Sequence, residues 1–301
     1  MLSAVLAVAL LMPPVQPVVA DSSYVPQRVF DTRQKGFADF ETMIADLARA
    51  DTVFVGEQHD DPNTHRLELA IVEGLTRRGV AVVIALEMFE RDVQSDVERY
   101  AAGTATEAQF LAASRPWPRY AADYRPLIEF ALAHHLPIVA SNVPRRIAAD
   151  VSKTGMTVLD RLGNERGLAA REPQCPTSGD YYDRFGEMMG DHPAAGDAVP
   201  GEVKARNDRF YFAQCLKDET MGESVAEAFQ RSTGRVTIVH VNGAFHSDFG
   251  EGAAESARRR LPGRRVAVVS VLPVPDLDTV KPDDDDLKRA DYLLFTVNGK
   301  R

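Results

Sequence analysis

Short apolar runs alternate with longer amphipathic segments along most of the chain. A continuous apolar and β-branched run is typical of a strand that is buried on both faces. Amphipathic patterns at 64–78 and 121–135 predict helices, and in the first of them Leu67, Ile71 and Leu75 form one stripe that ends before Gly79. The predicted strands lie at 52–55, 80–86, 137–140, 236–241, 266–272 and 292–297, the last of them at an edge of the sheet.

Strands separated by helices predict an α/β fold with a mostly parallel β-sheet core, flanked by helices and built with right-handed crossovers. The stretch 151–231 has no strand pattern, and we predict that it forms a helical insert, or lid, between the third and fourth of these core strands. A Pro- and Gly-rich loop interrupts the insert at 191–201. Residues 21–301 are therefore expected to form a single domain.

The first twenty residues carry no charged side chain, include an apolar run at 4–11 and end in Val-Val-Ala before Asp21. This pattern fits a signal peptide with a small-residue cleavage site, and the run is too short to span a bilayer. We expect a signal peptide at 1–20 and a soluble periplasmic or secreted protein with no transmembrane segment in the mature chain. No Cys follows the cleavage site, which argues against a bacterial lipoprotein anchor.

Two cysteines, Cys175 and Cys215, lie in the mature part of the chain. An even pair in an oxidising compartment favours a disulfide, and two buried free thiols are the alternative. Neither residue lies in a CxxC or CxxCH motif, which argues against a zinc ribbon and against covalent haem attachment.

The composition is that of an ordinary globular protein, with 45% hydrophobic and 26% charged residues among 301. The formal net charge of −9 argues against a nucleic-acid binder, because phosphate contacts need clustered Lys and Arg. The basic run at 258–260 fits a solvated helix end better than a basic rim that meets carboxylates.

A Gly-x-x-His motif occurs twice, each time at the end of a predicted strand. His59 ends the motif that begins at Gly56, and His246 ends the one that begins at Gly243. In an open parallel sheet, ligands bind beyond the carboxyl ends of the strands. Glycine at such a position allows a sharp turn and a close approach to the backbone. The two motifs therefore place both histidines on the same rim of one sheet.

Two more strands bring polar residues to this rim. The run at 82–86 ends in Glu87, and the strand at 137–140 is followed by Asn142 and then by Arg145. Apolar strands that end in ionisable groups are hard to explain by packing, because burying an unpaired charge is costly. The sequence therefore predicts a shared site that contains Glu57, His59, Glu87, Asn142, Arg145 and His246.

Each of these residues also has a purely structural interpretation. Glu57 and Asp60 could cap the helix that begins near Thr64, and His246 could be a turn histidine with its polar atoms satisfied. Glu87 could form a structural ion pair with Arg145. A shared site is the simpler explanation for several such residues at one edge of the sheet.

The segments around these motifs resemble the ChaN-like family. The similarity lies in Val-Phe-Val-Gly-Glu-Gln-His-Asp at 53–60, Ala-Leu-Glu-Met-Phe at 85–89 and Val-Asn-Gly-Ala-Phe-His at 241–246. It extends to Trp-Pro-Arg-Tyr at 117–120, Tyr-Arg-Pro at 124–126 and Ile-Val-Ala-Ser-Asn-Val-Pro-Arg at 138–145. This family belongs with the Tiki and TraB proteins in a haem-binding-uptake superfamily that is more distantly similar to erythromycin esterases. The matches run in order from about residue 35 to residue 300.

The resemblance implies haem binding linked to haem or iron uptake, with Tyr and His as iron ligands or propionate contacts. We also expect a homodimer, because a large flat haem held by one small slot leaves apolar surface to cover, and an outer-membrane partner for haem or iron uptake. Tyr181 or Tyr182 with His192 is the axial pair that we predict, and Tyr124 and Asn142 are further contacts. An apolar slot could be built by Phe185, Met188, Met189, Phe210 and Phe212, which could equally form the insert's own core.

The alternative function is a metal-dependent hydrolase, since in the Tiki and TraB relatives the paired motifs resemble divalent-metal ligands that support peptide hydrolysis. His59, Glu87, His246 and Glu57 suit Zn²⁺, Mn²⁺ or Co²⁺ with one position left for water. Glu57 or Glu87 would then act as general base. The esterase relatives suggest metal-free catalysis in which His59 activates water. Arg145 would stabilise an oxyanion in either scheme. A non-catalytic binding protein for another tetrapyrrole or a metal ion is a third hypothesis.

Overall fold

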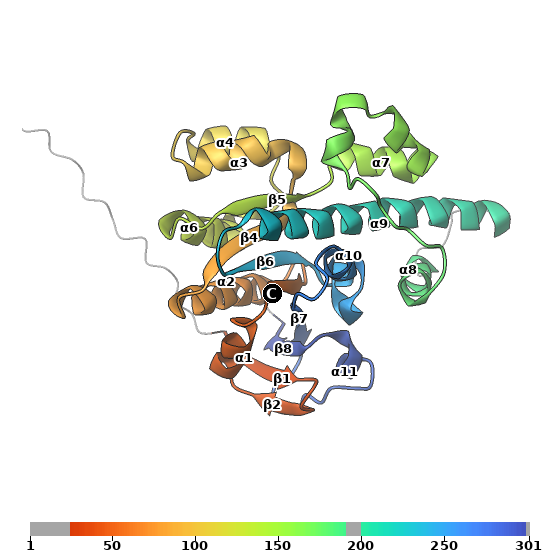
Figure 1. Cartoon of the computed structure of the whole chain (residues 1–301). Helices are drawn as coiled ribbons and strands as arrows, with labels where there is room; N and C mark the ends of the chain where they lie inside the picture. Colours follow the sequence, from red (N-terminus) through yellow and green to blue (C-terminus); the bar gives the residue numbers. More distant parts are fainter. Residues whose placement is uncertain (1–24, 191–199, 299–301) are drawn as a thin grey trace, which may run out of the picture.

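The computed structural model describes residues 25–190 and 200–298, and its centre is one eight-stranded sheet (Figure 1). The strand order is β2-β1-β8-β7-β3-β6-β4-β5. The six strands from β8 to β5 run parallel, and β1 and β2 form an antiparallel hairpin at one side. The strands span Gln27–Asp31 (β1), Gly36–Ala38 (β2), Thr52–Glu57 (β3), Ala81–Glu90 (β4), Ile138–Asn142 (β5), Val236–Gly243 (β6), Val266–Val274 (β7) and Tyr292–Val297 (β8).

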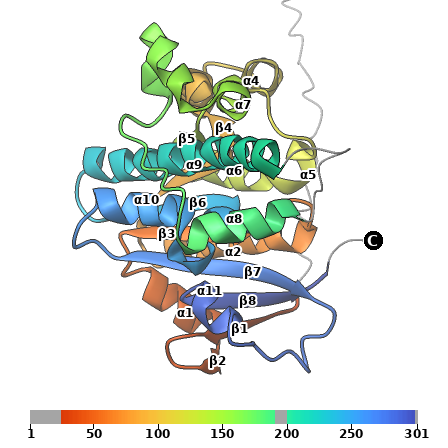
Figure 2. The same cartoon turned by 90° about the vertical axis from the view of Figure 1, so that its right-hand side faces the viewer.

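Helices cover both faces of this sheet, which confirms the predicted α/β class (Figure 2). Alternate side chains of the central strands pack on α1, α2 and α6 on one face and on α9 and α10 on the other. The helices span Phe40–Leu47 (α1), Pro62–Arg77 (α2), Gln94–Ala101 (α3), Glu107–Ser114 (α4), Tyr120–Asp123 (α5), Arg125–Ala133 (α6), Arg145–Thr154 (α7), Asp180–Gly190 (α8), Pro200–Arg231 (α9), Gly252–Arg260 (α10) and Asp286–Arg289 (α11).

Two predicted elements differ from the structure. The helix predicted at 121–135 is divided at Tyr124 into α5 and α6, because Pro126 has no N–H and cannot continue the hydrogen bonding of α5. The strand at 292–297 is not at an edge, since β1 pairs with it antiparallel on the side away from β7. The hairpin that covers it is short and was not predicted.

In the described residues the chain between β5 and β6 contains no strand and is mostly helical, as predicted, with a non-helical stretch at 169–179 before α8. Its longest helix, α9, lies along the sheet and packs on β5 and β6, so it forms part of the core layer. The predicted disulfide is present: Cys175 bonds to Cys215 and fastens the segment before α8 to α9. No helix in the described ranges combines the length and apolar character that a membrane span requires.

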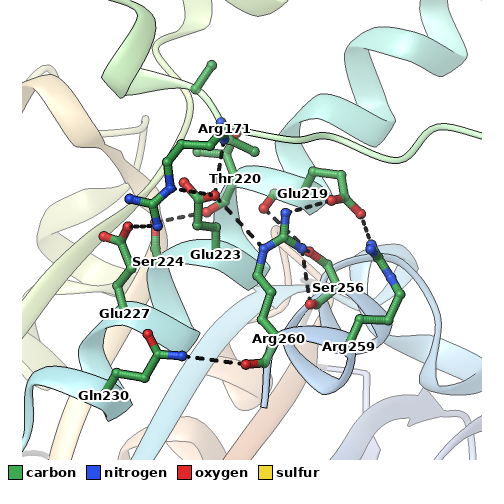
Figure 3. Close-up of polar contacts among 12 residues, drawn as sticks. Arg171, Glu219, Thr220, Glu223, Ser224, Glu227, Gln230, Ser256, Arg259 and Arg260 are labelled. Carbon is green, nitrogen blue, oxygen red and sulfur yellow. Dashed lines mark hydrogen bonds and ion pairs between the residues drawn. The ribbon is translucent and has the colours of Figure 1, made fainter. Parts of the chain in front are cut away.

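An ion-pair network joins α9 to α10 and to the segment that follows α7 (Figure 3). Glu219 pairs with Arg259 and Arg260, while Glu227 accepts a hydrogen bond of 2.6 Å from Arg171. Glu223, between them on α9, accepts from the backbone N–H of Arg171 at 3.1 Å. Arg258 pairs with Glu255 at 2.7 Å. All three arginines of the run at 258–260 therefore meet carboxylates, contrary to the solvated helix end that the sequence favoured.

A side chain, that of Gln94, forms hydrogen bonds with the free backbone edge of β5, the last strand of the sheet. The Gln94 amide donates to the carbonyl of Ile138 at 3.0 Å and accepts from the N–H of Ala140 at 2.7 Å. It thus replaces part of the next strand, which limits pairing of this edge with another chain.

Candidate functional site at the carboxyl ends of the strands

The structure brings four predicted residues together at the carboxyl ends of β3, β6 and β4. Glu57 ends β3 and pairs in register with Gly243, the last residue of β6. Glu87 lies in β4, and His246 follows β6 in a 3₁₀ turn at Ala244–His246. His59 and His246 line a hollow of about 360 Å³, which is also lined by Glu57, Gln58, Tyr181, Arg184, Gly243, Ala244, Phe245, Asp248, Phe249, Glu251 and Arg289.

The two motif glycines are needed because the two motifs touch each other. A Cβ on Gly243 would lie 2.7 Å from the His59 ring, and a Cβ on Gly56 would lie 3.0 Å from the Cα of Ala244. Neither glycine has a positive φ. Glycine is therefore required because the two motifs approach each other closely. The sharp turn that the sequence analysis expected is not the reason.

A first chain of hydrogen bonds runs inward from His59. Its Nδ1 lies 2.5 Å from Oε1 of the buried Glu57, which also accepts from the hydroxyl of Tyr124 at 2.8 Å. The His59 side chain is 49% exposed and touches the edge of Trp117. In the neutral imidazole Nδ1 carries the proton toward Glu57, which leaves Nε2 as an acceptor. Burial opposes the charged form of His59, but Glu57 and Glu87 outweigh it and raise its pKa.

A second chain runs through His246. Its Nε2 is 3.3 Å from Glu87 and its Nδ1 is 2.6 Å from Asp218 of α9. Asp218 also accepts a short hydrogen bond from the Tyr181 hydroxyl of α8. The other oxygen of Glu87 accepts from the N–H of Gly243 at 2.7 Å. The insert therefore contributes a carboxylate and a phenol to the strand-end site.

These contacts set the charges of the site. Burial opposes the charged imidazolium of His246, but the carboxylates of Glu87 and Asp218 outweigh it and raise its pKa to about 10. Burial would raise the pKa of Glu87, yet His246 and His59 lower it to about 2. The pKa of Glu57 is likewise held below its usual range, because its contacts with His59 and His65 outweigh burial. At neutral pH Glu57 and Glu87 are therefore ionised and His246 is protonated.

Three functional candidates escaped the sequence analysis. His65 and Glu68 of α2 are buried behind Glu57, and Asp218 is buried beside His246. The spacing of His65 and Glu68 by three residues on a helix immediately after the first motif was a usable signal, since such side chains share one helix face. Asp218 gave no signal, because acidic residues are frequent along α9.

The remaining predicted residues lie in different places. Tyr124 contacts Glu57, and Asn142 donates to the backbone carbonyl of Glu87 at 3.1 Å, so both support the site. Arg145 is turned away from the site, and its side chain is 68% exposed. Its guanidinium lies 3.5 Å from Glu90, so Arg145 forms its ion pair with Glu90 and not with Glu87. His192 lies outside the described residues.

The apolar residues proposed as a haem slot do not form one slot. Phe185 is buried with Tyr211 and Cys215, and Met189 and Phe212 pack against this cluster, which is the insert's own core. Met188 on α8 and Phe210 on α9 are exposed. Tyr182 is partly buried, and its hydroxyl contacts both Asp208 and Lys204 of α9.

Fold and site together define an α/β protein with a polar hollow at the carboxyl ends of a mostly parallel sheet and a helical segment that reaches into it. The chain belongs to the family described as haem-binding uptake, Tiki superfamily, ChaN, whose model matches residues 43–256. This confirms the family that the motifs indicated.

Solved structures share this fold. A ChaN structure from Campylobacter jejuni, described as showing cofacial haem binding, has a TM-score of 0.67 at 18% identity and covers 90% of this chain and 96% of its own. A succinoglycan biosynthesis protein has a TM-score of 0.50 at 10% identity, covering 86% of this chain and 92% of its own.

A curated relative, the chloroplastic protein RETICULATA-RELATED 5 of Arabidopsis thaliana, is 24% identical over 242 residues. The match covers 75% of this chain and 32% of that protein, so the chain spans about a third of the length of this relative.

Proposed function

We propose that this protein binds haem as part of haem or iron uptake. The observation that carries the proposal is the α8–α9 surface of a chain that belongs to the haem-binding family. There Tyr182 offers a phenol near the surface, and Met188 and Phe210 of the same two helices are 39% and 37% exposed. A phenolate for ferric iron and apolar area for the porphyrin are the groups that a haem requires.

Tyr182 is a better candidate for the iron ligand than Tyr181. The Tyr181 hydroxyl is engaged by Asp218, and burial together with that carboxylate raises its pKa well above the usual value. Binding of iron by Tyr181 would break this contact and place another negative charge beside Asp218. The Tyr182 hydroxyl also donates to a carboxylate, that of Asp208 at 2.5 Å. Here, however, Lys204 lies 3.0 Å from the Tyr182 oxygen and 2.9 Å from Asp208, so its positive charge would remain to offset that of a bound phenolate.

The proposal includes export of the protein, a homodimer and an outer-membrane partner. Export is supported by the apolar pattern of residues 1–20, which lie outside the described residues. A homodimer that stacks two haems is supported by the cofacial haem binding described for the Campylobacter jejuni protein and by the exposed Met188 and Phe210. An outer-membrane uptake partner would deliver or receive the haem.

The test is a visible-absorption titration of the purified protein with ferric haem. We expect a saturable shift of the main haem band, and Tyr182→Phe should weaken binding at least about tenfold, a loss of about 1.4 kcal/mol. Tyr100→Phe, on α3, is the matched control that should bind like the wild type. A flat response from the wild type would refute haem binding, and equal binding by Tyr182→Phe would refute this ligand.

Hydrolysis is the second candidate function, and the His59–Glu57 pair favours it. A half-exposed imidazole held by a buried carboxylate has the arrangement of a general base that activates water. The geometry leaves Arg145 outside this scheme. Release of product from a peptide or ester should then be lost in His59→Ala, measured by chromatography of the products. Undiminished release by His59→Ala would contradict this candidate.

A further inference from the structure

We propose that Glu57, His65 and Glu68 form a buried binding site for one divalent transition-metal ion, with Zn²⁺ as the best fit. This site shares only Glu57 with the metal set predicted from the sequence, which was His59, Glu87, His246 and Glu57. It does not depend on haem binding. The ligands come from the end of β3 and from one face of α2.

The three side chains converge on one point. His65 Nδ1 lies 3.3 Å from Glu57 Oε2 and 3.2 Å from Glu68 Oε2, and one ligand atom from each residue fits within 4.8 Å of the others. Around Zn²⁺ with bonds of about 2.0–2.1 Å, adjacent ligands of a tetrahedron stand about 3.3–3.4 Å apart. The two nitrogen–oxygen separations are already close to this value.

Two oxygen atoms in this cluster have no hydrogen-bond donor. Glu57 Oε2 and Glu68 Oε1 are both buried, and neither has a hydrogen-bond partner. Leaving a carboxylate oxygen buried and unpaired costs free energy, so such an atom calls for an explanation. The other oxygen of Glu57 is fully engaged by His59 and Tyr124, which leaves Oε2 as the one directed at the cluster.

The surroundings orient His65 for metal binding. Its Nε2 lies 3.2 Å from the backbone carbonyl of His59, and because a carbonyl only accepts, Nε2 must carry the proton. Nδ1 is then available as a ligand. A carbonyl that holds the far N–H of an imidazole is the usual support for a histidine bound to metal.

The charges also call for a cation. Two carboxylates and one imidazole lie together out of water, and the two carboxylates, when ionised as metal ligands, carry a charge of −2. A divalent ion bound to neutral His65 would bring the total to zero. One imidazole with two carboxylates suits Zn²⁺, and water could complete the coordination.

Metal content of the full-length protein tests the site. The protein is unfolded in denaturant with a chelator, refolded with Zn²⁺, desalted and analysed by mass spectrometry of the elements, because a buried site is loaded during folding. We expect about one zinc per chain and a higher Tm than for the zinc-free protein. Glu68→Gln should lose zinc affinity at least about tenfold and lose this rise in Tm.

Two variants separate this site from others. Glu73→Gln makes the same change at an exposed position of α2 and should retain the zinc. His246→Ala should also retain it, because His246 is not a ligand here. Zinc that is lost in His246→Ala and kept in Glu68→Gln would overturn the proposal.

The wild-type protein provides a test that does not require any variant to fold. Co²⁺ in place of Zn²⁺ should give the strong visible bands of a tetrahedral site. A wild type that refolds without zinc and without cobalt bands would also overturn the proposal. Because haem is absent throughout, none of these outcomes depends on the haem titration.

Discussion

His246 is held between two buried carboxylates that come from different parts of the chain. Glu87 belongs to a core strand and Asp218 to a helix of the insert, and together they keep the imidazole protonated. Removing one partner from a buried set of charges is strongly destabilising, because it leaves the others buried and uncompensated. The stability of this protein should therefore depend on pH through His246.

The pKa of His246 is raised from 6.5 to about 10 on folding. Its contribution to stability is therefore complete below pH 6.5 and disappears as the pH rises through about 10. We expect the free energy of unfolding of the wild type to exceed that of His246→Gln at pH 6.5, and this excess to shrink by at least about 1.4 kcal/mol, the value of one pKa unit, near pH 10. Urea unfolding of both proteins at the two pH values measures this difference in the free energy of unfolding.

Other groups face His246 and titrate with it. They are Glu87 of β4, Asp218 of α9, His59 beyond Gly243 and Tyr181, which donates to Asp218. His134→Gln, at an exposed position at the end of α6, is the control that should show no such change. An excess that stays constant from pH 6.5 to pH 10 would show that His246 is not charged in the folded protein.

The crossing of α9 and α10 depends on small side chains. Gly222 of α9 lies directly on α10, where a Cβ would run into Ser256 and come within 2.8 Å of the carbonyl of Ala253. The network of Figure 3 closes over the same crossing through Glu219, Arg259 and Arg260. Since α9 also carries Asp218, the fit of the two helices helps to place the site.

Gly222→Ala should separate α9 from α10. We expect the free energy of unfolding to fall by about 1–3 kcal/mol, the usual cost of an overpacked helix contact, although Ala is the better helix former. Gly201→Ala in the same helix meets no atom within 4 Å and should not destabilise the protein. The free energies of unfolding of the two variants are measured with denaturant. If Gly222→Ala is as stable as Gly201→Ala, the helices can shift without cost and this prediction is wrong.

Element-scale prediction succeeded where the pattern is local. All the predicted core strands are present, because each is a continuous apolar run buried on both faces. The division of the 121–135 helix at Tyr124 was visible in Pro126 and was overlooked. The hairpin of β1 and β2 was not visible, because short edge strands carry few apolar residues and their pairing with β8 is a long-range choice.

At the scale of the whole molecule, the candidate site is a meeting of segments far apart in the sequence. Residues 57, 87, 218 and 246 come from three strand ends and one helix. The sheet order places β6 between β3 and β4, so the two motifs face each other across adjacent strands. The disulfide between Cys175 and Cys215 then keeps the segment that leads to Tyr181 close to α9.

The sequence by itself determined the fold class, the family, the disulfide partners and the rim that holds both motif histidines, because apolar runs, strand ends and short motifs are local features. Only the tertiary structure decided that Asp218 completes the contacts of His246, that His65 and Glu68 lie behind Glu57, and that Arg145 pairs with Glu90. These outcomes depend on helix crossings and side-chain directions between distant segments. Their free energies arise from burial and charge pairing that no single segment contains.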